Sequence, residues 1–187
     1  VGFNEPDQGS VRLDGVSIFK WDKSELGPNI GYLPQSIEIF GGTVVENICR
    51  FTEPNMESLQ IACSHAGLED VYNDYFNGID KEIDPDSMTL SGGMKQKIGI
   101  ARAMYGDPKF IVFDEPTSSL DAESEKLFIN SLDYFRKKNS TVIVMTHNKS
   151  ILKVADHILV LYKGRQKIFD SKKNIAQKMR MSQLENT

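Results

Sequence analysis

Leu90-Ser91-Gly92-Gly93-Met94-Lys95-Gln96 begins the stretch that decides the fold, which continues through Phe110-Ile111-Val112-Phe113-Asp114-Glu115-Pro116 and ends at Ser118-Ser119-Leu120-Asp121. The short, fully apolar run over 110–113 is typical of a strand buried on both faces of a parallel sheet. Ligands of open α/β sheets bind outside the carboxyl ends of the strands. Asp114 and Glu115 therefore stand where a ligand would lie, and Pro116 stops the strand.

Adjacent carboxylates at a strand end indicate divided labour. One of the two acids can hold Mg²⁺, directly or through water, and the other can orient a nucleophilic water. Taken alone, the pair is equally compatible with two solvated acids in a turn.

A helix is predicted to begin after Ser91. Ser91 is a favoured N-cap residue, and Gly92 and Gly93 would let backbone N–H groups approach an anion that the helix dipole also favours. Helical spacing of apolar residues follows, at Met94, Ile98, Ala101 and Tyr105. An ordinary capped helix on a glycine turn would look the same.

Two further strands are predicted to end at polar side chains. The run from Ile30 stops at Pro34 and is followed by Gln35, and the buried-strand run over 141–146 is followed by His147. Because parallel strands share one carboxyl edge, His147 and Glu115 are expected on the same rim. A surface histidine after a strand is the alternative.

The remaining elements follow from periodicity and turn residues. We predict a β-hairpin over 11–18, a connecting segment over 21–26, two or three short helices over 44–76, a polar loop over 77–88, a helix that Asp121 could cap, a short helix over 151–155, a strand–turn–strand over 157–169 and a polar helical tail from 172.

The composition is that of a globular domain, with 187 residues, 40% hydrophobic and 26% charged. A net charge of −4 gives no reason to expect a nucleic-acid partner. No apolar run approaches the ~20 residues of a membrane helix. Cys49 and Cys63 are too few for a disulfide scaffold or zinc site and fit a reducing compartment.

Together these pieces resemble the ATP-binding cassette (ABC) ATPases over nearly the whole chain. Leu90 to Gly93 match the signature motif, 110–115 the Walker B strand and Asp121 the D-loop. Gln35 and His147 match the Q-loop and the H-loop, and the continuation over 39–48 is similar to the exporter form of the Q-loop. The short helical insert lacks the long coiled coil of chromosome-maintenance ATPases.

The resemblance implies an α/β fold like that of P-loop NTPases, with a mostly parallel core sheet, an antiparallel β edge layer and a helical signature subdomain. Residues 1–187 would form one partial ABC ATPase domain. Its Q-loop and helical subdomain would span 35–90, and its signature, Walker B, D-loop and H-loop core 91–170.

The resemblance also implies ATP and Mg²⁺ as ligands. Asp114 and Gln35 would serve Mg²⁺, Glu115 would polarise water, and His147 would contact the γ-phosphate. The nucleotide-binding set would be Gln35, Leu90, Ser91, Gly92, Gly93, Asp114, Asp121 and His147. Two cassettes would pair head to tail, so that Ser91 to Gly93 of one contact the ATP of the other.

The sequence departs from this family at two points. No G-x-x-x-x-G-K-[ST] phosphate loop occurs in it, so we expect a fragment that begins inside the domain and is inactive alone. Such a fragment would leave Ile111, Val142 and Val144 poorly covered. The signature usually ends in Gln, and here the position is Met94, which puts the fine geometry in question.

Within exporters, the stretches 21–22, 26–35 and 101–108 resemble ATPases of bacterial type I protein secretion. This implies a transmembrane domain in the same parent chain and a place at the cytoplasmic face of the inner membrane. The rivals are a soluble ABC ATPase of DNA repair or translation and a non-hydrolysing regulatory cassette.

Overall fold

A computed structural model describes residues 1–77, 82–83 and 90–175. The chain divides into two compact units, Val1–Thr146 and His147–Thr187, and each is described by itself. Most of the polar loop predicted over 77–88, and the tail beyond residue 175, lie outside the described residues.

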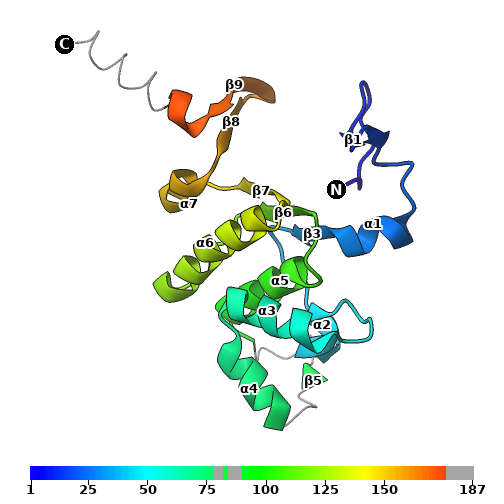
Figure 1. Cartoon of the computed structure of the whole chain (residues 1–187), viewed down its shortest axis with the longest axis vertical. Coiled ribbons are helices and arrows are strands. Elements are labelled where there is room, and N and C mark those ends of the chain that lie inside the picture. The colour runs from blue at the N-terminus through cyan, green and yellow to red at the C-terminus, as the bar shows by residue number, and fades with distance from the viewer. Residues whose placement is uncertain (78–81, 84–89, 176–187) are drawn as a thin grey trace, which may run out of the picture. The chain divides into compact units, whose positions relative to one another are not determined.

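The centre of the first unit is a parallel sheet of β3 (Ile30–Leu33), β6 (Phe110–Asp114) and β7 (Thr141–Met145), in the order β3-β6-β7 (Figure 1). Both pairings are parallel. Each strand is a short apolar run, as expected for buried parallel strands. The predicted α/β fold with a parallel core is confirmed.

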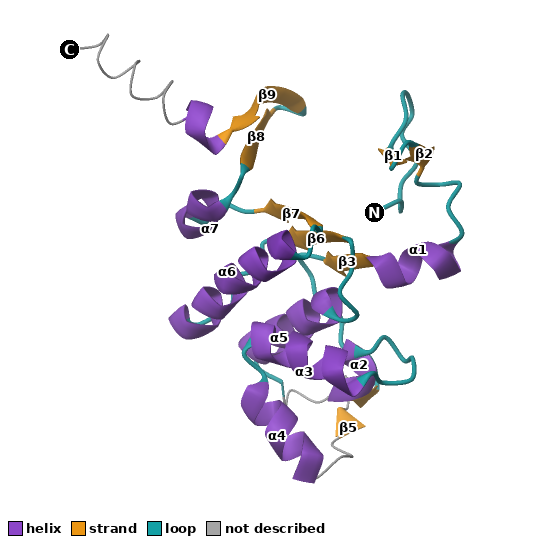
Figure 2. Ribbon diagram, viewed as in Figure 1, coloured by secondary structure: helices purple, strands orange, loops and turns teal. Residues whose placement is uncertain are grey.

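One face of this sheet is covered by α5 (Gly92–Met104) and α6 (Ala122–Lys137), the helices that lie beside the strands in Figure 2. Ile111 and Phe113 are 0% exposed on that face, and the Phe113 ring meets Phe128 of α6 edge-on, 5.0 Å between centroids. The other face is more open, as the exposed fractions of Ile143 (46%) and Met145 (44%) show.

The expectation that Ile111 would be poorly covered was therefore wrong. Ile111 is fully buried, and Val142 and Val144 are half-buried, because their side chains share the face that the helices cover. The exposed apolar residues are the alternate ones, Ile143 and Met145.

Backbone contact between β3 and α5 depends on Gly31. A Cβ added there would overlap the carbonyl oxygen of Ala103 in α5 and lie 3.0 Å from a methyl of Ile111. Neither neighbour is a flexible chain end that could move aside, so the missing side chain lets helix and strand approach closely.

We expect Gly31→Ala to destabilise the fold by on the order of 3 kcal/mol or more, because the overlap forces the helix from the sheet. Urea unfolding followed by circular dichroism measures this. Gly27→Ala is the matched control, since nothing lies within 4 Å of the added Cβ there. Equal unfolding midpoints for the two variants would contradict the close-packing role of Gly31.

The helical insert consists of α2 (Val44–Ile48), α3 (Met56–Ala66) and α4 (Glu69–Asn77), as predicted. Thr43 and Glu46 form a capping box that begins α2. Gly67 ends α3 at a φ of 69°, a left-handed conformation that glycine adopts without strain. Packing of α3 on α5 and α6 joins the insert to the sheet-covering helices.

The hairpin near the start is confirmed, with β1 (Arg12–Leu13) antiparallel to β2 (Val16–Ser17). Two elements differ from the prediction. The segment after Asp22 is a helix, α1 (Lys23–Asn29), because the Asp22 carboxylate caps it by accepting from the Ser24 N–H. A two-residue pairing of β4 (Gly42–Thr43) with β5 (Glu82–Ile83) was also not anticipated.

Both cysteines of the chain are free and buried in the helical insert. Cys49 is 1% exposed at the end of α2, and Cys63 is 4% exposed in α3. Burial raises the pKa of the Cys49 thiol and raises that of Cys63 to about 12.

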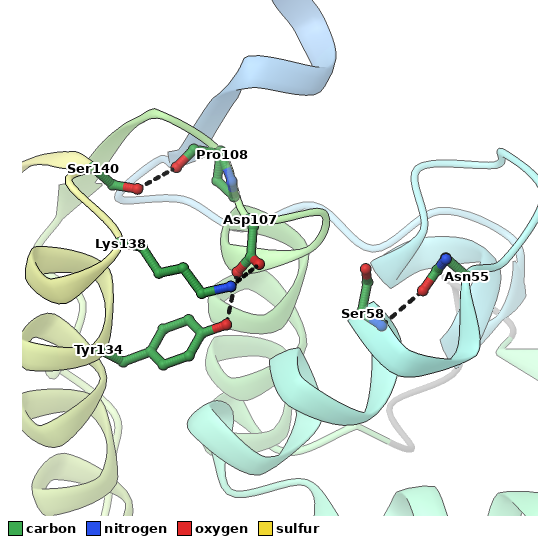
Figure 3. A network of polar contacts seen from close by, with 7 residues as sticks. All are labelled: Asn55, Ser58, Asp107, Pro108, Tyr134, Lys138 and Ser140. Atoms are coloured by element: carbon green, nitrogen blue, oxygen red, sulfur yellow. Dashed lines mark hydrogen bonds and ion pairs between the residues drawn. The ribbon is translucent and has the colours of Figure 1, made fainter.

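A polar network ties the turn after α5 to the end of α6 (Figure 3). The Asp107 carboxylate accepts a hydrogen bond from the Tyr134 hydroxyl at 3.0 Å and pairs with the Lys138 ammonium at 2.9 Å. The Ser140 hydroxyl donates to the Pro108 carbonyl at 2.9 Å. Burial raises the pKa of Asp107, but the bonds from Lys138 and Tyr134 outweigh it, and the net pKa is lowered from 3.8.

A carboxyl whose pKa is lower in the folded state adds stability above its unfolded pKa and loses it as the pH falls through the folded value. We therefore expect the wild type to be more stable than Asp107→Asn above about pH 4, with the difference shrinking below it. Thermal unfolding at several pH values measures this. Asp70→Asn, an exposed carboxylate outside the network, is the control. A difference independent of pH would contradict the ion pair.

The second unit holds α7 (Lys149–Val154) and a hairpin of β8 (His157–Tyr162) with β9 (Arg165–Ser171). The Asn148 side chain caps α7 by accepting from the Ser150 N–H. The short helix and the strand–turn–strand were both predicted. No described helix in either unit is long and apolar enough to cross a membrane.

Candidate nucleotide site

The carboxyl ends of β3 and β6 carry the predicted polar side chains at matching positions. Leu33 pairs with Phe113 as the last pair between the two strands, and Asp114 pairs with Met145 of β7. Gln35 follows Leu33 by two residues and is exposed. The structure thus places Asp114 at the last paired position of β6, and Gln35 and Glu115 just beyond the ends of β3 and β6.

Glu115 leaves the strand in a constrained backbone conformation. Its φ is 46°, in the left-handed region that residues other than glycine adopt at a cost of about 1–3 kcal/mol. Its N–H donates to the Met145 carbonyl at 2.9 Å, and its carbonyl accepts from the Ser118 N–H at 3.3 Å. The half-buried side chain therefore starts from a backbone held on both sides.

The predicted start of α5 is confirmed. Ser91 is the N-cap, and its hydroxyl accepts from the Met94 N–H at 3.2 Å. A hydroxyl can accept this bond and still donate its own hydrogen. Ser91 and Gly92 are exposed. Met94 thus contributes its backbone to the cap, which does not depend on the glutamine usual at that position.

The loop after β6 lies along the first turns of α5. A Cβ on Gly93 would lie 3.1 Å from the Ser119 carbonyl oxygen, and the Lys97 ammonium lies 3.6 Å from the Asp121 carboxylate. The first turns of α5 and the loop at Ser119 to Asp121, apart in sequence, are therefore neighbours.

Asp121 caps α6, as one of its two predicted roles required. Its carboxylate accepts from the Ser124 N–H at 2.8 Å. This bond, with the Ser124 side chain and Lys97, lowers the pKa of Asp121 below 3.8. The D-loop role stays a prediction, and the N-cap does not conflict with it.

His147 is the first residue of the second unit, two residues beyond the end of β7. It is exposed. Its predicted place on the rim with Glu115 remains a prediction.

The donor set fits Mg²⁺. Among the described residues, no group of three His, Cys, Asp or Glu side chains could hold a metal ion. Mg²⁺ is usually bound through one or two carboxylates together with substrate phosphates and water. Asp114, with the amide oxygen of Gln35 at the same sheet edge, would supply such oxygen ligands.

The segment after Gln35 is anchored by two residues that sequence reasoning missed. The Arg102 guanidinium donates to the Glu38 carbonyl at 2.9 Å and to the carbonyl and side-chain oxygens of Asn47, both at 2.8 Å. Asn47, 0% exposed, bonds both the N–H and the carbonyl of Phe40. Burial lowers the pKa of Arg102, and Arg50 lowers it further. A buried asparagine in an apolar helix was the available signal.

Gln96 was also missed. It lies on α5 at 4% exposure, and its Nε2 donates to the Pro116 carbonyl at 2.8 Å and to the Glu115 carbonyl at 3.4 Å. It stands four residues before the buried Ile100, so a polar residue in an apolar stripe could have revealed it.

Comparisons with known proteins place this geometry in one family. Over residues 1–118, the chain matches the family model described as ABC transporter. Over its whole length it superposes on a bacterial Atm1-family ABC exporter with ATP bound, with a TM-score of 0.82, 26% identity and 34% of that chain covered.

Curated relatives agree. The chain is 42% identical over 180 residues, 95% of its length, to the type I secretion system ATP-binding protein PrsD of Rhizobium meliloti. It is 34% identical over 163 residues, 87% of its length, to an ATP-dependent lipid A-core flippase of Burkholderia pseudomallei. It spans 31% and 27% of the length of these relatives. The chain belongs to the ABC transporter family.

Proposed function

We propose that these residues form the ATP-binding and ATP-hydrolysing cassette of a membrane exporter. The observation that carries the proposal is the contact of the α5 start with the loop after β6. It joins an anion-binding helix end, Ser91 to Gly93, to the carboxylates Asp114 and Glu115 in one body. A helix N-terminus can bind phosphate, and the two acids can bind a cation and orient a water. This combination suits a nucleoside triphosphate.

Each residue then has one task. Asp114 and Gln35 hold Mg²⁺, which when bound neutralises phosphate charge. Glu115 orients and polarises the attacking water, and its fixed backbone limits the positions its carboxylate can take. His147 contacts the γ-phosphate. Catalysis by such a set consists mainly of positioning and charge stabilisation.

We propose that two cassettes pair head to tail. Ser91 and Gly92 are exposed in the single chain, as residues that contact a second molecule would be. Ser91 to Gly93 of one cassette then bind the phosphate of the nucleotide held by the other. Asp121 lies in the loop that borders this helix start. The phosphate loop of the site is not among these 187 residues.

For the cargo we propose a secreted protein. The cassette would lie at the cytoplasmic face of the bacterial inner membrane and act on a transmembrane domain in the same polypeptide. The support is the 42% identity to a type I secretion ATP-binding protein, against 34% to lipid A-core flippases. Residues 21–22, 26–35 and 101–108 carry the same resemblance in the sequence.

The test uses the complete protein in lipid vesicles and a strain that lacks its gene. We expect Mg²⁺-dependent ATP hydrolysis in the vesicles and the loss of one or more proteins from the culture medium of the strain. Hydrolysis without any change in the medium would remove the secretion assignment. Absence of hydrolysis would favour the regulatory cassette, and full activity without a membrane would favour a soluble ATPase.

A further inference from the structure

The buried side-chain amide of Gln96 is hydrogen-bonded to the backbone at Glu115 and Pro116. Its side chain is 4% exposed, and its Nε2 donates to two successive carbonyls, those of Glu115 and Pro116. A buried polar group is costly unless it is hydrogen-bonded, and an apolar side chain of the same size would fill the space at no such cost. The amide is therefore present for its bonds.

The bonded turn is one that needs support. Glu115 has a φ of 46°, and such conformations persist only where the surroundings over-determine them. Its N–H is fixed from β7 by the Met145 carbonyl. The carbonyl side of the same residue is fixed by Gln96 and by the Ser118 N–H. Gln96 is thus the support that comes from α5.

The same helix begins at Ser91, and Gln96 lies five residues further on. Gly93 and Lys97 contact Ser119 and Asp121 of the loop that Gln96 holds. A displacement of the α5 start therefore reaches the backbone at Glu115 through the buried 2.8 Å bond from Gln96 to the Pro116 carbonyl, its longer 3.4 Å bond to the Glu115 carbonyl and the two flanking contacts.

We propose that Gln96 is a positioning residue, which sets the backbone of Glu115 and so aims its carboxylate according to where the helix of Ser91 stands. The inference rests on the proposed ATP hydrolysis. It adds that the helix start at Ser91, which contacts one nucleotide, controls the orientation of the Glu115 carboxylate, which acts on the other nucleotide.

The experiment uses the complete protein and compares Gln96→Met with the wild type. Methionine keeps the volume and the helix propensity but removes the donor. We expect kcat to fall by about 10- to 100-fold, as small misplacements of catalytic groups do, with the Kd for Mg-ATP changed by less than about twofold. Ser131→Ala is the control, because it removes another buried side-chain bond, to the Phe128 carbonyl in its own helix.

A second variant, Gln96→Glu, separates bonding from packing. Ionised glutamate cannot donate, but the protonated acid has one O–H donor. We expect its kcat relative to the wild type to rise at least threefold from about pH 8 to about pH 6, because burial favours the protonated form. This variant also decides the question if Gln96→Met does not fold.

Hydrogen exchange at residues 115–121 adds a readout independent of turnover. We expect the Ser118 amide to exchange faster in Gln96→Met than in the wild type, and at the wild-type rate in Ser131→Ala. The inference would be overturned, and the proposed function left standing, if the wild type hydrolyses ATP and the kcat of Gln96→Met lies within threefold of the wild-type value. The same holds if the kcat of Gln96→Glu relative to the wild type does not change with pH. An inactive wild type with unchanged Ser118 exchange in Gln96→Met would remove both.

Discussion

Replacing Glu115 with Gln in the complete protein is expected to abolish turnover and leave ATP binding intact. Glutamine keeps the size and the backbone bonds to Met145 and Ser118, but it cannot polarise a water as a carboxylate does. The expected loss is about 10²–10⁴ in kcat. Because the nucleotide is held by other residues, its Kd should stay within a few-fold of the wild type.

Steady-state ATP hydrolysis and equilibrium nucleotide binding measure the two quantities. Glu53→Gln, an exposed glutamate in the loop before α3, is the matched control and should behave as the wild type. If Glu115→Gln loses less than tenfold in rate, Glu115 is not the base. If it loses nucleotide binding as well, the acid belongs to the binding set instead.

The second large effect concerns which of the two nucleotides Ser91 contacts in the proposed head-to-tail dimer. In a mixed dimer with one Ser91→Arg subunit, we expect nucleotide to be lost from the wild-type subunit's site, by at least about tenfold. The long side chain fills the space in front of the helix end that a phosphate would take, and the cap bond to Met94 is lost. The mutant subunit's own site should keep its nucleotide.

Photo-crosslinking of an azido-ATP to differently tagged subunits tells the two sites apart. Ser10→Arg, a substitution of an exposed serine in a turn, serves as the control for added charge and bulk. Labelling lost from the mutant subunit itself would show that the helix end acts within its own chain. Labelling unchanged on both subunits would remove Ser91 from the nucleotide site.

Much of the fold could be predicted because its elements carry strong local signals. Residues 110–113 of β6 and 142–145 of β7 are unbroken apolar runs, and α5 and α6 begin at good N-caps, Ser91 and Asp121. The helix α1 was missed because Gly27 and Pro28 lie inside it, and both residues normally oppose helix. The two-residue pairing of β4 with β5 depends on contacts remote in sequence, which no local pattern contains.

Faces of the sheet were harder to predict than its strands. A strand of continuous apolar residues does not say which alternate set is more deeply covered. Ile111 and Val142 were expected to be open, and the exposed residues are Ile143 and Met145. Only the helices α5 and α6, which pack on one side, decide this.

Part of the candidate site could likewise be predicted from the sequence, and part could not. Sequence placed Gln35, Asp114 and Glu115 at the ends of strands, and the register of β3 with β6 confirms that these ends are adjacent. It could not find the hydrogen bonds of Gln96, because a glutamine in a helix is ordinarily a surface residue. Partner choice for a buried amide depends on tertiary packing, which periodicity does not encode.

The two buried cysteines make the chain suitable for site-specific labelling without removal of its native thiols. Maleimides and spin labels react with thiolates. With a pKa of about 12, Cys63 is thiolate in about one molecule in ten thousand at pH 8. Burial shields Cys49 as well, at 1% exposure. A single cysteine introduced at the exposed Ser119 would therefore carry nearly all of a probe, and a fluorophore there would report directly on the loop beside α5 as nucleotide is added.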